Sequence, residues 1–144
     1  MFEKILVPID GSEHSTNAMK RAFQIAKKFN GKITLLHAYS EHLVSLPKEY
    51  VRAESTSQMV EVCRDIGVRI LADAQAKAQT ADIQVETLLT AGQPVETIID
   101  ASRNGGFDLI VIGARGLSPM KEILLGSVSH GVTTHARCPI LVVK

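Results

Sequence analysis

The sequence has few cysteines and little net charge. Its 144 residues include only Cys63 and Cys138, which lie far apart and form neither a CxxC pair nor the spacing of zinc ligands. This pattern argues against a disulfide scaffold and against a zinc finger. The 16 basic residues nearly balance the 15 acidic residues and form no basic stripe. We therefore expect neither a nucleic acid nor an anionic membrane surface as a partner.

Long apolar runs are also missing. No run approaches the length that spans a membrane, and the chain starts with a strand-like segment at residues 4–7 instead of the regions of a signal peptide. Hydrophobic residues make up 45% and charged residues 22%, as in ordinary globular proteins, and no internal repeat or linker interrupts the chain. We expect a single cytoplasmic domain over residues 1–144, without a membrane segment.

Strand and helix patterns alternate along the chain. Apolar residues recur at helical spacing around residues 18–29, 59–80, 95–99 and 128–136. The apolar segments that precede, separate and follow these helices are predicted as five strands: Ile5–Ile9, Ile33–Ala38, Ile83–Leu89, Asp108–Ile112 and Pro139–Val143. The alternation predicts an α/β fold, a doubly wound, five-stranded and mostly parallel sheet with helices on both faces. The segment from Tyr39 to Ser57 fits either a lid over a ligand or a partner surface.

Ligands of doubly wound sheets bind beyond the carboxyl ends of the strands. One such loop, from Gly113 to Ser129, is rich in glycine. Gly126 has no side chain that could obstruct the start of the helix at Ser127. The free N–H groups, the dipole and the hydroxyls at the start of that helix suit phosphate oxygens. The glycines also fit a purely structural role in tight turns.

Asp10 follows the first predicted strand and has two interpretations. An aspartate at this position often caps the next helix. A carboxylate at a strand end also accepts hydrogen bonds from ribose hydroxyls in dinucleotide-binding folds. The two roles do not exclude each other.

Several catalytic motifs are missing. The sequence has no Gly-x4-Gly-Lys-Ser/Thr and no Gly-x-Gly-x-x-Gly after the first strand, which argues against a P-loop NTPase and a dinucleotide-dependent dehydrogenase. Ser127 replaces the first glycine of a hydrolase elbow around Ser129, and the histidines form no HExxH motif. We expect no protein-built metal site, although Mg²⁺ can arrive with phosphates and few protein ligands.

The spacing Gly113-x2-Gly116-x9-Gly126-Ser127 resembles the nucleotide-binding signature of the ATP-binding branch of the universal stress protein family. Residues 7–12 and 139–143 are similar to the opening and closing strands of that family, and the resemblance covers the whole chain. It implies a Rossmann-like fold of the adenine nucleotide alpha hydrolase type. It also implies ATP as the ligand, with Mg²⁺ and with ADP or AMP as alternatives.

The resemblance implies a set of residues around the nucleotide. Ile9 and Asp10 would lie beside adenine and ribose, and Ala38 would border the base. The phosphates would lie on the glycine motif and its two hydroxyls, at Ser127 and Ser129. The whole set is Pro8, Ile9, Asp10, Ala38, Ile112, Gly113, Arg115, Gly116, Gly126, Ser127, Val128 and Ser129.

Three functions remain open. The first is an ATP-binding stress-response or regulatory module with little turnover, because no catalytic base is evident. The second is a slow enzyme that hydrolyses ATP, phosphorylates itself or transfers a nucleotidyl group. The third is a nucleotide-independent dimeric scaffold. A homodimer is expected in any case, because the apolar segment Pro139–Val143 is predicted to lie at a sheet edge, where unpaired backbone can bind a second chain.

Overall fold

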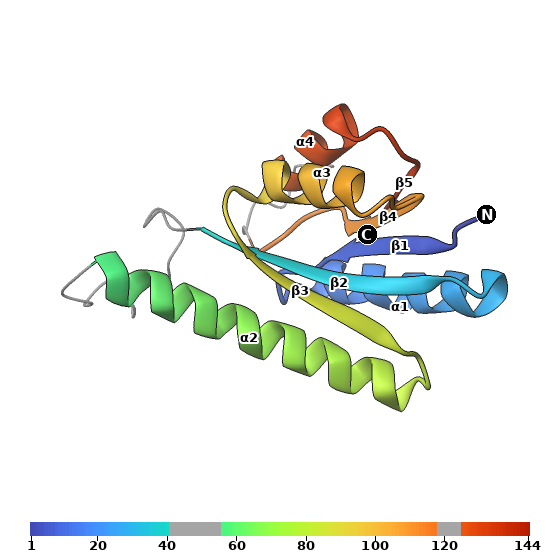
Figure 1. Ribbon diagram of the computed structural model, residues 1–144, viewed down its shortest axis with the longest axis horizontal. Coiled ribbons are helices and arrows are strands. Elements are labelled where there is room, and N and C mark those ends of the chain that lie inside the picture. Colours follow the sequence, from blue (N-terminus) through green and yellow to red (C-terminus); the bar gives the residue numbers. More distant parts are fainter. Residues whose placement is uncertain (41–55, 118–124) are drawn as a thin grey trace.

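The computed structural model describes residues 1–40, 56–117 and 125–144, so most of the segment from Tyr39 to Ser57 lies outside the described residues. Strands and helices alternate through these residues as the sequence predicts (Figure 1). The elements are β1 Lys4–Pro8, α1 Glu13–Phe29, β2 Lys32–Tyr39, α2 Thr56–Thr80, β3 Val85–Ala91, α3 Pro94–Asn104, β4 Leu109–Gly113, α4 Ser127–His135 and β5 Ile140–Val143.

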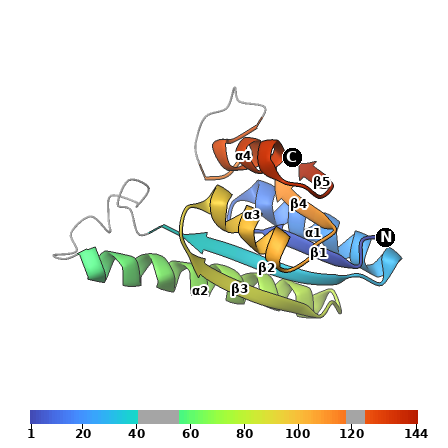
Figure 2. The same ribbon diagram turned by 45° about the horizontal axis from the view of Figure 1, so that its top comes forward.

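The five strands form one sheet in the order β3-β2-β1-β4-β5. All four strand pairings in it are parallel, which confirms the predicted doubly wound α/β fold. Helices α1 and α2 cover one face of the sheet, and α3 and α4 cover the other (Figures 1 and 2). The strand order reverses between β1 and β4, so the carboxyl ends of these two strands flank the place where such sheets bind ligands.

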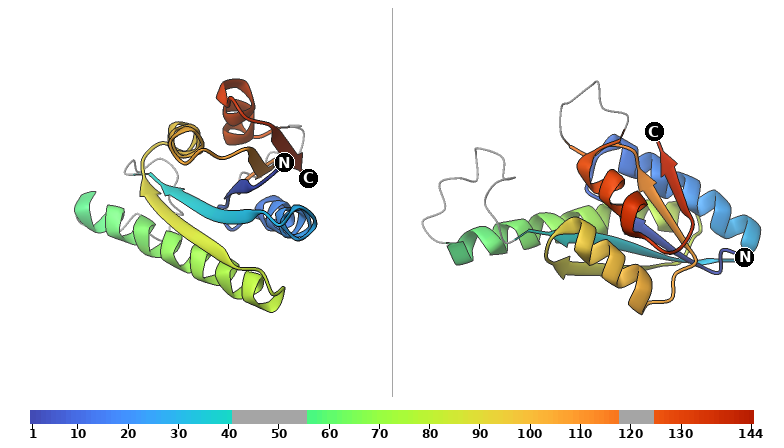
Figure 3. Two further views of the ribbon diagram at one scale, coloured as in Figure 1. Left: turned by 45° about the vertical axis from the view of Figure 1, so that its right-hand side comes forward. Right: turned by 90° about the horizontal axis from the view of Figure 1, so that it is seen from above.

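The core has two parts, one on each face of the sheet. Alternate residues of β1 point to opposite faces, so Ile5 and Val7 contact the α1 and α2 side while Leu6 contacts the α3 and α4 side. All five residues of β4 are buried, as the continuous apolar run Leu109–Ile112 predicts. The two views of Figure 3 show the helices in two layers with the sheet between them.

Local signals explain where the helices end. The Ser12 side chain accepts a hydrogen bond from the Ser15 N–H and caps α1, and Asn30 ends this helix in the left-handed region at φ 55°. Pro94 stands in the first turn of α3, where a missing N–H costs nothing. Among the described helices, none is both long enough and apolar enough to span a bilayer.

The third strand begins later than the sequence predicts. Ile83 was expected to open it, but the Ile83 N–H donates to the Ala78 carbonyl at 2.9 Å and closes the end of α2. The strand therefore starts at Val85 and continues to Ala91. It lies at one edge of the sheet.

Candidate functional site

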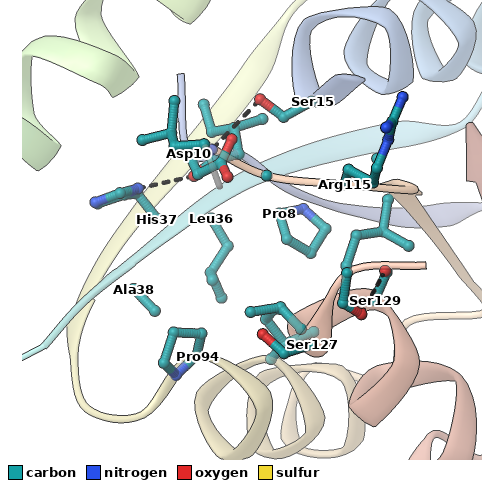
Figure 4. A pocket seen from close by; sticks show the side chains of 18 residues that line it. Pro8, Asp10, Ser15, Leu36, His37, Ala38, Pro94, Arg115, Ser127 and Ser129 are labelled. Atoms are coloured by element: carbon teal, nitrogen blue, oxygen red, sulfur yellow. Dashed lines mark hydrogen bonds between the residues drawn. The ribbon is translucent and has the colours of Figure 1, made fainter. Parts of the chain in front are cut away.

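A cavity of about 290 Å³ lies at the carboxyl ends of β1, β2 and β4, beside the point where the strand order reverses. It brings together all twelve residues that the sequence predicts for the site: Pro8, Ile9, Asp10, Ala38, Ile112, Gly113, Arg115, Gly116, Gly126, Ser127, Val128 and Ser129. In the view of Figure 4, Ala38 lies on one side of the cavity, Ser127 and Ser129 lie on the other, and Pro8 lies between them.

Asp10 uses its two carboxylate oxygens differently. Oδ1 accepts a hydrogen bond from the Ser12 N–H at 2.9 Å and holds the turn that leads into α1. The cap of α1 is Ser12, so the interpretation of Asp10 as that cap is wrong. Oδ2 has no hydrogen-bond partner among the described residues and lies toward Gly116, where a Cβ would come within 2.6 Å of it. Gly116 therefore leaves room for a carboxylate oxygen that lines the cavity.

Gly113 allows α1 to approach the end of β4. A Cβ at this position would lie 2.7 Å from the carbonyl carbon of His14 and 2.8 Å from the Ser15 backbone nitrogen. Both contacts are with backbone, so a larger residue would require α1 to move. This glycine has a packing role that sets the position of the first turn of α1 against the cavity.

The amino end of α4 faces the cavity with N–H groups that have no partner within the helix. Its cap residue Gly126 supplies no side chain, and the first backbone bond within the helix runs from the His130 N–H to the Gly126 carbonyl at 2.9 Å. The N–H groups of residues 127–129 precede that bond and have no partner in the helix. Together with the helix dipole they form a site suited to an anion.

The hydroxyl groups of Ser127 and Ser129 have different surroundings. Ser129 is buried, and its hydroxyl donates to the Ala114 carbonyl at 2.7 Å, with the Gly126 carbonyl 3.0 Å away. This hydroxyl joins α4 to the end of β4. Ser127 is exposed, and its hydroxyl is the one that lies open to the cavity side.

Arg115 lines the cavity but extends toward α1. Its Nη2 donates to Nε2 of His14 at 3.5 Å, and Figure 4 shows the side chain pointing away from Ser127 and Ser129. The guanidinium is held at one rim of the cavity by α1.

The backbone of Ala38 is left without a partner strand on the β1 side. Even-numbered residues of β2 bond to β1, since the Lys32 N–H donates to the Glu3 carbonyl and the Leu36 carbonyl accepts from the Ile9 N–H. The next rung would join the Ala38 N–H to the Ile9 carbonyl. In the described structure this bond is not formed. The register ends at Pro8 and Leu36, and the Ile9 carbonyl accepts a hydrogen bond from Nδ1 of His37 at 2.8 Å.

Six residues that sequence reasoning missed also line the cavity: Ser15, Leu36, His37, Pro94, Ile98 and Leu117. Leu36 could have been predicted from the alternation of side chains along β2, because residues 36 and 38 point to the same face of the strand. Pro94 opens α3 directly after β3, so it too lies at the carboxyl end of a strand. Ile98 is one helical turn further on and lines the same wall.

The described lining of the cavity offers neither a group of metal ligands nor a cysteine. Within residues 1–40, 56–117 and 125–144, no three His, Cys, Asp or Glu side chains are grouped so as to hold a metal ion. Neither cysteine lines the cavity, and burial raises the pKa of both thiols. The arrangement suits binding of a ligand with an apolar part, a hydroxyl-bearing part and an anionic part.

Comparison with known proteins identifies the family of the chain. The sequence model of the universal stress protein family matches residues 1–144. Universal stress protein YxiE of Bacillus subtilis is 36% identical over the full length of both chains. The chain belongs to the universal stress protein family.

Solved structures of universal stress proteins share the fold. Universal stress protein UspA from Lactobacillus plantarum is 26% identical, with a TM-score of 0.83 over 99% of this chain and 98% of the other. A universal stress protein solved in complex with cAMP is 29% identical, with a TM-score of 0.72 over 99% of this chain and 97% of the other. A nucleotide thus binds to a relative of this universal stress protein.

Proposed function

We propose that this universal stress protein binds ATP in the cavity described above and acts as a nucleotide-dependent regulatory module in a stress response. The observation that carries the proposal is the backbone edge of Ala38, which has no partner on the β1 side among the described residues and shares one cavity with Asp10 and the amino end of α4. These three groups match the base, ribose and phosphates of a nucleotide. Residues 1–144 would form one binding domain that acts in the cytoplasm.

The Ala38 edge supports adenine as the base. Its N–H is a donor and its carbonyl an acceptor. Adenine presents an acceptor at N1 and a donor at its N6 amino group, so both bonds can form. Guanine presents a donor at N1 and an acceptor at O6, which reverses the pattern and leaves buried polar groups unpaired. The apolar side chains of Leu36, Ile98 and Pro94 would contact the faces of the ring.

The other end of the cavity supports the sugar and phosphates. Oδ2 of Asp10 is placed to accept hydrogen bonds from ribose hydroxyls, and Gly116 leaves it unobstructed. The free N–H groups of residues 127–129 and the Ser127 hydroxyl would donate to phosphate oxygens. Mg²⁺ would enter bound to the phosphates, with its own waters, since Asp10 is the only acidic side chain in the described lining of the cavity.

The same lining favours a binding module over a fast enzyme. Its described part contains no lysine and no cysteine. Its one imidazole, that of His37, donates from Nδ1 to a backbone carbonyl. A P-loop enzyme relies on a lysine at the terminal phosphates, and that support is missing from the described lining. We expect that the protein acts through the binding of ATP rather than through its hydrolysis.

Calorimetric titration of nucleotide-stripped protein tests the proposal. Mg-ATP should give saturable binding at micromolar concentration, and Mg-GTP should bind at least about tenfold more weakly, because its base reverses the hydrogen-bonding pattern at Ala38. AMP and cAMP titrated under the same conditions would show how much the outer phosphates contribute. Absence of heat with all four nucleotides, at protein concentrations that detect millimolar affinity, would reject the nucleotide site.

We also propose a homodimer in which the edge strand β5 pairs with its copy. The carbonyls of Pro139 and Val143 accept from the N–H groups of Ile110 and Ala114, so these residues bond to β4. By alternation, the N–H and carbonyl groups of Ile140 and Val142 point outward from the free edge of the sheet. Unpaired edge groups of this kind bind a second strand readily.

A Val142→Pro variant tests the dimer. It removes an outward N–H without removing a bond to β4, and proline is tolerated at an outward-facing edge position. We expect light scattering to give twice the chain mass of 15.6 kDa for the wild type and a single chain mass for the variant. Retained ATP binding would show that the variant is folded. A wild type that runs as a monomer at micromolar concentration would contradict the prediction.

A further inference from the structure

The His37 side chain bonds to the carbonyl that would accept the next backbone hydrogen bond between β1 and β2. A carbonyl only accepts hydrogen bonds, so Nδ1 of His37 carries the proton in its 2.8 Å bond to the Ile9 carbonyl. That carbonyl is the group to which the Ala38 N–H would donate if the ladder between β1 and β2 continued by one rung. A side chain of β2 thus takes the acceptor that the backbone of the next residue would otherwise use.

We infer that His37 is a positioning residue, which keeps the backbone edge of Ala38 free so that adenine can bind to it. The ligand in this inference rests on the proposed function, whereas the competition between His37 and the Ala38 N–H concerns the protein alone. Ile9 is 5% exposed, so its carbonyl requires a partner within the protein. When the imidazole supplies this partner, the Ala38 N–H stays available to the cavity.

Helix α2 holds the imidazole in this position. Gly67 lies directly against the ring, since a Cβ at this position would come within 2.7 Å of His37 Cδ2 and within 2.7 Å of Leu89 Cδ1. The glycine therefore leaves a notch in α2 that the imidazole fills. Figure 4 shows the result, with the His37 ring bonded at one side of the cavity and the Ala38 side chain beside it. The helix thus determines which donor reaches the Ile9 carbonyl.

Two substitutions of His37 with side chains of nearly equal shape distinguish the effect of its hydrogen bond from the effect of its packing. In His37→Asn the amide nitrogen is attached to Cγ, as Nδ1 is in histidine, so the donor to the Ile9 carbonyl is kept. His37→Leu has the same branching and no donor. In the leucine variant the Ile9 carbonyl should take the Ala38 N–H as its partner, and the ladder should extend by one rung.

Amide hydrogen exchange, followed by NMR in the nucleotide-free protein, gives the deciding measurement. We expect the Ala38 N–H to exchange at least about tenfold more slowly in His37→Leu than in the wild type, with His37→Asn close to the wild type, because a newly bonded amide is protected. Unchanged exchange at Ala38 in a folded His37→Leu variant would overturn the inference. Should that variant fail to fold, Gly67→Ala displaces the same ring and is expected to slow the same amide.

Nucleotide titration of the same variants adds a second readout. We expect His37→Leu to lose about tenfold or more in affinity for Mg-ATP, with little change for Mg-GTP, and His37→Asn to restore the preference for adenine. Equal affinity of both variants and the wild type for Mg-ATP would count against the inference. If the wild type binds no nucleotide, the proposed function fails by itself, and the exchange of the Ala38 amide still decides the role of His37.

Discussion

An Asp10→Asn variant is expected to bind Mg-ATP about ten- to hundredfold more weakly than the wild type. A hydrogen bond to a charged group contributes about 1.5–3 kcal/mol, which corresponds to this range of affinity. The amide oxygen can keep the 2.9 Å bond from the Ser12 N–H, so the turn before α1 should persist. The amide nitrogen then replaces Oδ2 beside Gly116 and cannot accept a bond from a ribose hydroxyl.

Deoxynucleotides show whether Asp10 acts on the ribose. The wild type should bind ATP more tightly than 2′-deoxy-ATP or 3′-deoxy-ATP, and this difference should disappear in Asp10→Asn because the acceptor for the sugar hydroxyl is gone. Thermal unfolding of the nucleotide-free variant should stay near that of the wild type, which would exclude a general loss of structure. An Asp10→Asn variant that binds ATP as tightly as the wild type would show that this carboxylate does not contact the ribose.

Gly126→Val is expected to reduce the affinity for Mg-ATP by about a hundredfold or more, which corresponds to roughly 2.7 kcal/mol or more. A Cβ at Gly126 would lie 3.4 Å from Arg115 Cα and 3.7 Å from the Gly116 backbone nitrogen. Both neighbours line the cavity, so the two methyl groups of valine would fill the space beside the N–H groups of α4. The phosphates would lose their approach to the helix.

Gly126→Ala is the matched control for this prediction. A single Cβ meets its neighbours at ordinary van der Waals distances of 3.4 to 3.7 Å, and Gly126 has a φ of −70°, which any residue can adopt. We therefore expect the alanine variant to fold normally and to lose much less affinity than the valine variant. Titration calorimetry and thermal unfolding of both variants give the comparison. Equal affinity of the valine variant and the wild type would place the phosphates elsewhere.

Much of this architecture could be predicted from local patterns. The apolar run Leu109–Ile112 predicts a strand buried on both sides, and the structure confirms it. Alternation of strands and helices predicts parallel pairing, because each helix returns the chain to the same end of the sheet. The resemblance to the universal stress protein family, carried by the glycine motif and the strand ends, implies twelve of the residues that line the cavity. Each of these signals depends on residues that are close in sequence or on a general rule of topology.

The roles of individual side chains at the site could not be predicted in this way. No local pattern predicts that the Ser129 hydroxyl donates to the Ala114 carbonyl, 15 positions earlier. Gly116 looks like a residue of a tight turn, but its missing side chain makes room for Asp10. Such contacts join segments whose separation in space depends on the whole packing arrangement.

The sequence by itself determined the order of the elements, the family and the loops that form the site, because hydrophobic periodicity, caps and glycine spacing are local properties of the chain. Only the tertiary structure decided which polar groups stay free in the cavity. The bond from His37 to the Ile9 carbonyl spans 28 positions and depends on where the register of β1 and β2 ends. A hydrogen-bonding group is free or paired according to which partners folding brings within reach, and that competition is settled only when the strands and helices are packed together.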